Sequence, residues 1–339
     1  MIKQFQRGVA AIALLAATVL AASPALAQQK SEIALSRQPG IFYMPSHIME
    51  KLKLIEKHAA SLGVPGVTTK WVTFSGGGAQ TDALLAGGVD ILNTGTGNLL
   101  LLWDRTRGGV KGIVATSGQP MTLISRDAKI QSIKDFGPGD KIAVPTVKVS
   151  TQAIVLQIAA AEAFGADQWS KLDANTVQLG HPDAYAALSN PKHEVHNHFS
   201  IPPFTFLELK NVPGAHIVLS SPDVMGGPLS QAQFFTTTKF ADANPKIIQA
   251  VRDATKEAQD LIRSDTRQAV EIYKEITGDK TSVEELLNLL KEPGMMEWNL
   301  EPQGTMKFAA HLFKTGTLKN QPKAWTDYYL PVAHDLKGN

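Results

Sequence analysis

The sequence predicts an α/β protein with two lobes, each a mostly parallel sheet flanked by helices, followed by a helical C-terminal tail. Between Glu32 and about Thr237, short apolar or β-branched runs alternate with longer runs of helical character. The alternation occurs in two successive sets, and after the segment Gln233–Phe240 only helical patterns remain. Strands separated by helices imply parallel β-α-β units, whose sheets are covered on both faces.

The first set begins with a strand at Glu32–Ser36 and a helix from about Ser46 to Leu62, which Gly63 ends. Its other strands are expected at Val67–Phe74, Val89–Leu92 and Lys111–Thr116. Two more helices are expected, one opened by the glycines 76–78 and running to Ala86, the other following the segment Asn93–Asn98 (NTGTGN) and running through Trp103.

The second set and the tail follow the same logic. Strands are expected at Met121–Ser125, Lys141–Val144, Thr176–Leu179, Glu194–Phe199 and His216–Leu219, and helices at Ser150–Phe164 and Pro182–Leu188. Ser150 or Thr151 can cap its helix, and Gly165 suits the position after the helix end. In the tail, Asn244-Pro245 and the pair Ser282 and Glu285 have the patterns of helix starts.

The first 27 residues have the three regions of a secretory signal peptide. Lys3 and Arg7 give a basic start, Gly8–Ala22 is an apolar run, and Ala25-Leu26-Ala27 fits the cleavage pattern. The apolar run is shorter than the roughly 20 residues that a membrane-spanning helix needs. We therefore expect cleavage after Ala27 and a mature periplasmic protein that begins at Gln28.

Composition excludes several classes of function. The chain has no cysteine, which excludes a cysteine-linked lipid anchor, disulfides, thiol catalysis and cysteine metal sites. Lys3 and Arg7 are two of its 33 basic residues, and their removal leaves 31 against 31 acidic residues. This balance gives no support for nucleic-acid binding, which requires a basic surface. About 310 exported residues suffice for two lobes with their own cores.

Open parallel sheets bind ligands at the carboxyl ends of their strands, where loops lead into helix N-termini. The loops at these positions are rich in Gly, Ser, Thr and Asn: Gln38–Phe42, Ser75–Gly78, Asn93–Asn98, Thr146–Thr151, His181–Asp183 and His198–Phe204. Such residues suit the recognition of a small polar ligand. Arg37 and Lys148 are the cations at these loops, so an anion would depend on helix N-termini at Gly76, Thr96 and Thr151.

Four segments, in their order along the chain, resemble a known family: Gly76–Asn98, Lys148–Gly165, Asn197–Phe204 (NHFSIPPF) and Phe234–Pro245 (FFTTTKFADANP). With them the sequence resembles the substrate-binding proteins of the nitrate/sulfonate/taurine group of ABC importers, which have the type II periplasmic binding fold. The resemblance covers nearly the whole mature chain. It does not select among the ligands of the group, which include nitrate, bicarbonate, sulfonates, aromatic acids and pyrimidines.

The resemblance implies one lobe made of residues 28–118 and 232–339, and a second made of residues 119–231. Two crossings would join them, near Ser117–Pro120 and Gly226–Gln233. It also implies a monomer without cofactor or enzymatic activity, which holds a small molecule in the cleft between the lobes and delivers it to a membrane permease.

The loops and the resemblance together give a set of expected ligand contacts: Gln38, Ile41, Phe42, Ser75, Gly76, Asn93, Thr94, Gly95, Thr96, Val149, Ser150, Thr151, His198, Ser200 and Phe204. Most of these are neutral donors, and arginine, the usual clamp for anions, is not among them. The expected ligand is therefore a small organic molecule with a carboxylate or sulfonate group. Ile41, Phe42 and Phe204 would contact its apolar part.

The segment Val195–Phe204 (VHNHFSIPPF) leaves a metal site and a pocket wall as alternatives. On a strand, His196 and His198 would share one face with Glu194, a direction suited to zinc. A metal site needs three or four ligands, and histidine pairs are more often satisfied locally. We expect no metal here, and the resemblance implies that His198 donates a hydrogen bond to the ligand.

Two other functions remain open. Some relatives of this fold make a pyrimidine precursor with histidine, iron and cysteine-containing motifs, whereas this chain has no cysteine and has an export signal. The sequence also has no Gly-x-Ser-x-Gly turn for a nucleophilic serine. A sensor module without a transporter would keep the same pocket.

Overall fold

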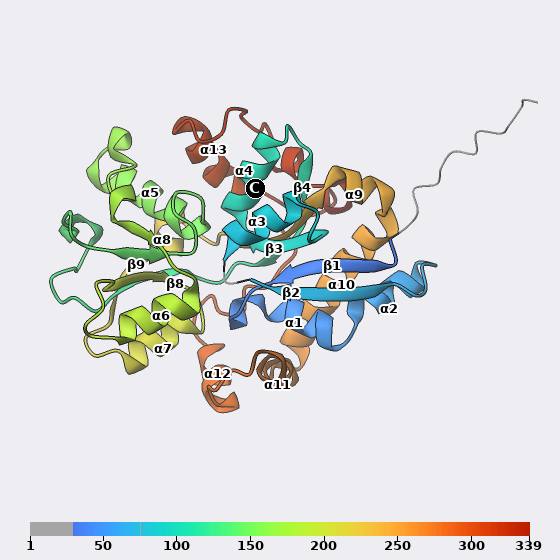
Figure 1. Ribbon diagram of the computed structural model, residues 1–339, viewed down its shortest axis with the longest axis horizontal. Helices are drawn as coiled ribbons and strands as arrows, with labels where there is room; N and C mark the ends of the chain where they lie inside the picture. Colours follow the sequence, from blue (N-terminus) through green and yellow to red (C-terminus); the bar gives the residue numbers. More distant parts are fainter. Residues whose placement is uncertain (1–29, 75) are drawn as a thin grey trace, which may run out of the picture.

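The computed structural model describes residues 30–74 and 76–339, so the expected signal peptide and Ser75 lie outside the described residues. It contains two five-stranded sheets (Figure 1). The first has the order β2-β1-β3-β10-β4, with β1 at Glu32–Arg37, β2 at Thr68–Thr73, β3 at Ile91–Gly95, β4 at Val110–Ser117 and β10 at Ala232–Thr237. The second has the order β7-β6-β8-β5-β9, with β5 at Thr122–Ser125, β6 at Ile142–Val144, β7 at Thr176–Gln178, β8 at Asn197–Ser200 and β9 at His216–Ser220.

Each sheet has one strand that runs against the other four. Strand β10 is antiparallel to both β3 and β4, and β5 is antiparallel to both β8 and β9, whereas the remaining pairs are parallel. The prediction of two mostly parallel sheets flanked by helices is confirmed. The reversed strands are the two that follow directly after the chain has passed from one sheet to the other.

The chain passes between the sheets twice, after β4 ends at Ser117 and before β10 begins at Ala232. We call the sheets with their helices the first and the second lobe; the residue limits of the lobes stay a prediction. A segment near the C-terminus lies along both crossings, because Gly118 N donates to the Glu297 carbonyl (2.7 Å) and Ser230 N to the Gln303 carbonyl (2.8 Å). The crossings are therefore braced by hydrogen bonds from outside the two sheets.

Helices cover both faces of each sheet, as Figure 1 shows. Their bounds are α1 Met44–Lys51, α2 Leu54–Ser61, α3 Gly77–Leu85, α4 Thr96–Arg105, α5 Thr151–Phe164, α6 His181–Ser189, α7 Phe204–Asn211, α8 Ser221–Met225, α9 Thr238–Ala243, α10 Pro245–Ser264, α11 Thr266–Thr277, α12 Val283–Leu289 and α13 Thr305–Lys314. In β1, Ile33 and Leu35 pack in the core with α1, α2 and α10, whereas Ala34 packs in the core with α4. Alternate residues of a strand point to opposite faces, so one strand contributes to both layers.

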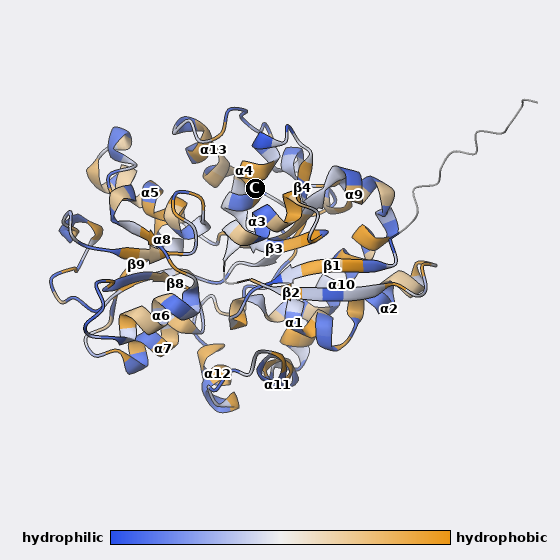
Figure 2. Cartoon of the chain, viewed as in Figure 1, coloured by the Kyte–Doolittle hydropathy of each residue, from blue (hydrophilic) through white to orange (hydrophobic). Residues whose placement is uncertain are grey.

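Helix α10 shows how the outer layer is attached to the first lobe. Its buried residues recur every three or four positions, including Ile247, Val251, Ala254 and Ala258, which gives one apolar face. Figure 2 shows hydrophobic colour concentrated on β1 and β3, while the helices around them carry mixed colours. None of the helices in the described residues is long and apolar enough to cross a membrane.

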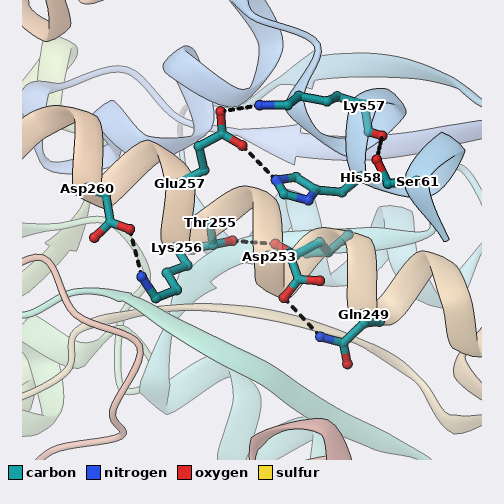
Figure 3. Close-up of polar contacts among 10 residues, drawn as sticks. Lys57, His58, Ser61, Gln249, Asp253, Thr255, Lys256, Glu257 and Asp260 are labelled. Atoms are coloured by element: carbon teal, nitrogen blue, oxygen red, sulfur yellow. Dashed lines mark hydrogen bonds and ion pairs between the residues drawn. The ribbon is translucent and has the colours of Figure 1, made fainter.

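Polar contacts add to the packing between α2 and α10. The Glu257 carboxylate on α10 accepts hydrogen bonds from Lys57 Nζ (2.6 Å) and contacts His58 Nε2 (2.7 Å) on α2 (Figure 3). The hydrogen bond from Lys57, and to a smaller extent the contact with His58, lower the pKa of Glu257, so its carboxylate is charged at neutral pH. The first lobe therefore has α2 held on α10 by both apolar burial and an ionic contact.

Several observed elements differ from the predicted ones. The single helix expected at Ser46–Leu62 is wrong, because α1 and α2 are separate helices and Lys53 between them has a left-handed backbone (φ 50°). The strand expected at Val89–Leu92 is observed at Ile91–Gly95, and α4 follows at once, so the expected loop Asn93–Asn98 does not exist. After the Pro202-Pro203 turn the chain forms helix α7, which was not predicted.

Candidate ligand-binding site

A narrow cavity lies between the two lobes. It has a volume of about 10 Å³, roughly the space that one water molecule needs. Its described lining residues carry no charged side chain: Gln38, Tyr43, Gly77, Thr94, Gly95, Asn98, Pro145, Ser150, Thr151, Gln152, His181 and Gln231. In this arrangement the lobes are closed on each other, and an organic ligand would need them to move apart.

A second, wider pocket of about 220 Å³ adjoins the cavity, and Pro145 lines both. Its other lining residues come from the start of α3 and from the segment that leads into α6: Gly76, Gly78, Ala79, Gln178, Leu179, Gly180 and Asp183. The two pockets together form a mouth and an inner cavity. The walls of the mouth belong to different lobes, so its width depends on how far the lobes are closed.

Four helices direct their N-terminal ends at the cavity, two from each lobe. Gly77 starts α3, Gly95 precedes α4, Ser150 precedes α5 and His181 starts α6. Only α5 has a side-chain cap, in which Ser150 Oγ accepts from Ala153 N (3.3 Å). Backbone N–H groups at a helix start have no intrahelical partner and carry partial positive charge. The arrangement can therefore bind an anion without a lysine or arginine.

The first lobe contributes to the cavity wall a hydroxyl group whose hydrogen is available for donation. Gln38 Nε2 donates to Tyr43 Oη (2.8 Å) and to Thr94 Oγ1 (3.1 Å), so the tyrosine oxygen acts as an acceptor toward Gln38. Burial raises the pKa of Tyr43, which keeps its hydroxyl protonated. The hydroxyl hydrogen of Tyr43 is then available as a donor to a ligand in the cavity.

The opposite wall has buried polar atoms without partners. Thr151 Oγ1 and Gln231 Oε1 make no hydrogen bond within the part of the chain that the structure describes. Both residues are almost completely buried and both line the cavity. Buried polar atoms are nearly always hydrogen-bonded in native proteins, so unpaired ones at a cavity indicate a place for a ligand or water.

Behind this wall, three buried ionisable side chains form a chain of hydrogen bonds. His181 Nδ1 lies 2.9 Å from His198 Nε2, and His198 Nδ1 lies 2.5 Å from Glu208 Oε1. Phe204 stacks on the His181 ring, with centroids 6.1 Å apart and planes 19° from parallel. Burial, and then the electrostatic influence of the neighbouring His198, hold the pKa of His181 well below its usual range. His181 therefore contacts the cavity as a neutral imidazole.

The structure brings five of the expected contacts into the cavity lining: Gln38, Thr94, Gly95, Ser150 and Thr151. Gly76 lines the mouth pocket, and Ser75 lies outside the described residues. The other expected contacts lie elsewhere in the described structure: Ile41, Phe42, Asn93, Thr96, Val149, His198, Ser200 and Phe204.

These residues are engaged in other parts of the structure. Ile41 and Phe42 are completely buried in the apolar cores. The Thr96 hydroxyl donates to the Ser230 carbonyl and accepts from Gln233 Nε2 (2.7 Å). His198 and Phe204 lie behind His181. Asn93 Oδ1 accepts from Thr116 Oγ1 (3.1 Å), and Ser200 is buried in β8.

The two loop cations do not line the cavity. Arg37 pairs with Glu50, and the Lys148 side chain is exposed to solvent. Sequence reasoning also missed several lining residues: Tyr43, Gly77, Asn98, Pro145, Gln152, His181 and Gln231. Gly77, Asn98 and His181 fall within three of the predicted loops, whereas Gln231 had no local signal because the crossing of the chain places it there.

The metal alternative has no support in the geometry. Across residues 30–74 and 76–339, no group of three or more His, Asp or Glu side chains is placed to hold a metal ion. Both ring nitrogens of His198 are engaged, by His181 and by Glu208. His193 Nδ1 accepts from Val195 N (3.1 Å), so the neighbouring histidine is satisfied locally.

Comparisons with solved structures identify the fold. No family model matches the sequence, and no curated protein sequence matches it. The alkanesulfonate-binding protein SsuA from Xanthomonas axonopodis pv. citri, bound to MOPS, is similar with a TM-score of 0.68 and 16% identity over 92% of this chain and 99% of that one. The periplasmic nitrate-binding protein NrtA from Synechocystis PCC 6803 has a TM-score of 0.67 and 14% identity, over 91% and 89% of the two chains.

A third solved structure is similar to this chain to a comparable degree. The Candida albicans CA3427 gene product, described as having the generic periplasmic binding protein structural fold, has a TM-score of 0.66 and 13% identity, over 88% of this chain and 96% of that one. At these identities the likeness concerns the fold. The chain has the periplasmic binding protein fold, as the resemblance of its sequence implies.

Proposed function

We propose that this protein is the solute-binding component of an ABC importer and that it captures a small anion between its two lobes. The observation that carries the proposal is the convergence of four helix N-termini, from both lobes, on a cavity whose described lining has no charged side chain. The neighbours in fold are named as sulfonate- and nitrate-binding proteins. A small organic sulfonate or carboxylate fits the same chemistry.

The energetics favour an anion held by neutral groups. A helix N-terminus contributes roughly 0.3–1 kcal/mol to a nearby negative charge when exposed, and about 2 kcal/mol in partly buried geometries. Four such ends acting on one enclosed site offset part of the cost of removing the anion from water. The hydroxyls of Tyr43 and Thr151 supply directional hydrogen bonds.

The proposal includes delivery of the ligand to an inner-membrane permease, action as a monomer in the periplasm after removal of residues 1–27, and no turnover of the ligand. The fold neighbours named above are binding proteins, which favours transport over enzymatic chemistry. The residues 28–118 with 232–339, and 119–231, are proposed as the two lobes that close on the ligand. A sensor module would use the same pocket with another partner, and copurification with a permease separates the two.

A thermal-shift screen of the mature protein tests the binding function. The panel contains methanesulfonate, MOPS, nitrate, bicarbonate and benzoate, with uracil as a neutral comparison and chloride as the control for ionic strength. A ligand that binds only the folded protein stabilises it by RT ln(1 + [L]/Kd), about 2.7 kcal/mol at a hundredfold excess over Kd. We expect at least one oxyanion to raise the melting temperature. A response to uracil alone, or release of a product from any bound compound, contradicts the proposal.

A further inference from the structure

We infer that the buried chain Glu208–His198–His181 takes up one proton when an anion occupies the cleft, and that this proton turns His181 into a hydrogen-bond donor toward the anion. The inference rests on the proposed function and deepens it, because it names the residue that favours ligands whose atoms accept hydrogen bonds. It concerns three residues of the second lobe, on β8, α6 and α7.

The geometry joins the three side chains end to end. Glu208 Oε1 lies 2.5 Å from His198 Nδ1, and His198 Nε2 lies 2.9 Å from His181 Nδ1. The remaining ring nitrogen, His181 Nε2, lies 3.3 Å from Gln152 Nε2, and both His181 and Gln152 line the cavity. Glu208 and His198 are completely buried and His181 is 3% exposed. The His181 end of this hydrogen-bonded chain therefore reaches the ligand site, whereas its Glu208 end is completely buried.

Counting hydrogens along this chain gives two states. Each of the two internal hydrogen bonds holds one hydrogen. With only these two, His198 donates to Glu208 and His181 donates to His198, so His181 Nε2 is left with a lone pair and acts as an acceptor. A third proton reverses the bond between the histidines, since His198 Nε2 then donates to His181 Nδ1. His181 Nε2 must then carry a hydrogen, so it no longer accepts from Gln152 Nε2 and is a donor toward a ligand.

The two states also differ in charge, and this difference too favours the protonated state when an anion is bound. Without the third proton the chain carries one negative charge, on Glu208, beside a site where four helix ends favour an anion. With the third proton the chain is neutral overall, as a Glu208 carboxylate paired with a charged His198. Burial holds the pKa of His181 low, and His198 is the ring that contacts the Glu208 carboxylate, so the added charge is placed on His198 and His181 stays neutral. A bound anion therefore favours the protonated chain.

The other titratable groups around Glu208, His198 and His181 are few, and they do not join this series of hydrogen bonds. On α6, Asp183 is exposed and the Tyr185 ring packs against Phe204; on α7, Lys210 pairs with Glu285 at the surface. Strands β5 and β6 have no titratable residue, and α5 contributes the neutral Gln152 to this site. Across the cleft stands Tyr43, whose pKa is raised by burial. None of these groups is placed to take up the proton in place of Glu208, His198 and His181.

The consequence for ligand choice follows from hydrogen bonding. A sulfonate or nitrate ion has only acceptor oxygens, so a lone pair on His181 Nε2 would face it unfavourably and an N–H group would bind it. At pH values above the range in which the free Glu208–His198–His181 group takes up its proton, the complex therefore holds one more proton than the free protein. Affinity must therefore increase as the pH falls, by at most about tenfold per pH unit for one proton, and level off once the free protein is already protonated.

Calorimetry of the mature protein tests this with methanesulfonate and nitrate, which remain ionised over the range used, about pH 5 to 9. Titrations in two buffers of different ionisation heat give the number of protons taken up per anion. We expect a value that rises toward one with increasing pH in the wild type, with the matching loss of affinity, and zero in Glu208→Gln. Glu194→Gln removes an exposed carboxylate from the same lobe and should behave as the wild type.

A second measurement is independent of the Glu208 variant and of ligand binding. The ¹⁵N resonances of the His181 ring in the ligand-free wild type report whether Nε2 carries a hydrogen, and we expect Nε2 to change from lone-pair to N–H form as the pH falls. Anion binding without proton uptake at any pH, or a His181 Nε2 that does not change over this range, overturns the inference and leaves the binding function standing. Failure of the wild type to bind either anion at every pH counts against both.

Discussion

Two threonine hydroxyls near the cleft have opposite environments, although both belong to helix starts. The Thr96 hydroxyl is hydrogen-bonded to the Ser230 carbonyl and to Gln233, so it joins α4 to the second crossing of the chain. The Thr151 hydroxyl is fully buried, lines the cavity and has no partner in the described structure. The first hydroxyl contributes to the stability of the folded protein, and the second is placed to contact a ligand.

Substituting each threonine separates these roles. Thr151→Ala should weaken binding of the best anion by about 1–3 kcal/mol, because a desolvated ligand oxygen loses its donor, while the free energy of unfolding changes little. Thr96→Ala should lower the free energy of unfolding by about 0.5–1.5 kcal/mol with a smaller effect on binding. Denaturant melts without ligand and calorimetry with it measure both quantities. Equal losses of affinity in the two variants would contradict the assignment of the ligand contact to Thr151.

At the scale of the elements, Gly97 allows α4 of the first lobe to approach the loop before α5 of the second. A Cβ atom at position 97 would lie 2.2 Å from the Val149 carbonyl oxygen and 2.8 Å from Ile154 Cδ1. The first distance is far inside van der Waals contact with backbone, which cannot move aside as a flexible side chain can. Gly97, the second glycine in NTGTGN, therefore serves close approach of the two lobes, and Val149 contributes its backbone to that contact.

Gly97→Ala should keep both lobes folded but hold them apart. We expect the affinity for the best anion to fall by at least about tenfold, which corresponds to about 1.4 kcal/mol, because the closed state becomes costly. Unfolding without ligand should change by less than about 1 kcal/mol, since the steric overlap is relieved by opening. Gly139→Ala, where an added Cβ meets no atom within 4 Å, is the matched control. Unchanged affinity in Gly97→Ala would show that binding does not need this approach.

The elements also show what sequence patterns can and cannot predict. Short apolar or β-branched runs and helix-like runs predicted the strands β1, β2 and β4 and the helices α3 and α5 to within one or two residues, because these patterns are local. The break at Lys53 was not predictable, since the apolar pattern continues through it. The loop glycines and Ser150 indicated the helix starts at the cleft, whereas Gln231 and the partnership of His181, His198 and Glu208 depend on tertiary packing that no local pattern encodes.

At the scale of the whole molecule, the closed arrangement leaves a cavity of about 10 Å³ behind a mouth whose walls come from both lobes. A ligand larger than water cannot enter such a space, so binding requires the lobes to separate and then close. The two braced crossings and the C-terminal segment along them are the places where this motion has to be accommodated. Opening and closing should therefore behave as movement of two stable lobes, with each core intact.

A disulfide across the mouth tests this requirement directly, because the chain has no cysteine of its own. A Cβ atom at Gly78 would lie 3.5 Å from Thr146 Oγ1 and 3.6 Å from its Cγ2, so cysteines at these positions are close to the geometry of a disulfide. In the oxidised double variant Gly78→Cys with Thr146→Cys, the association rate of the best anion should fall by at least about tenfold, and reduction should restore it. Each single variant under the same oxidant controls for the substitutions themselves. Equal association in the oxidised and reduced double variant would show that the anion reaches its site without separation of the lobes.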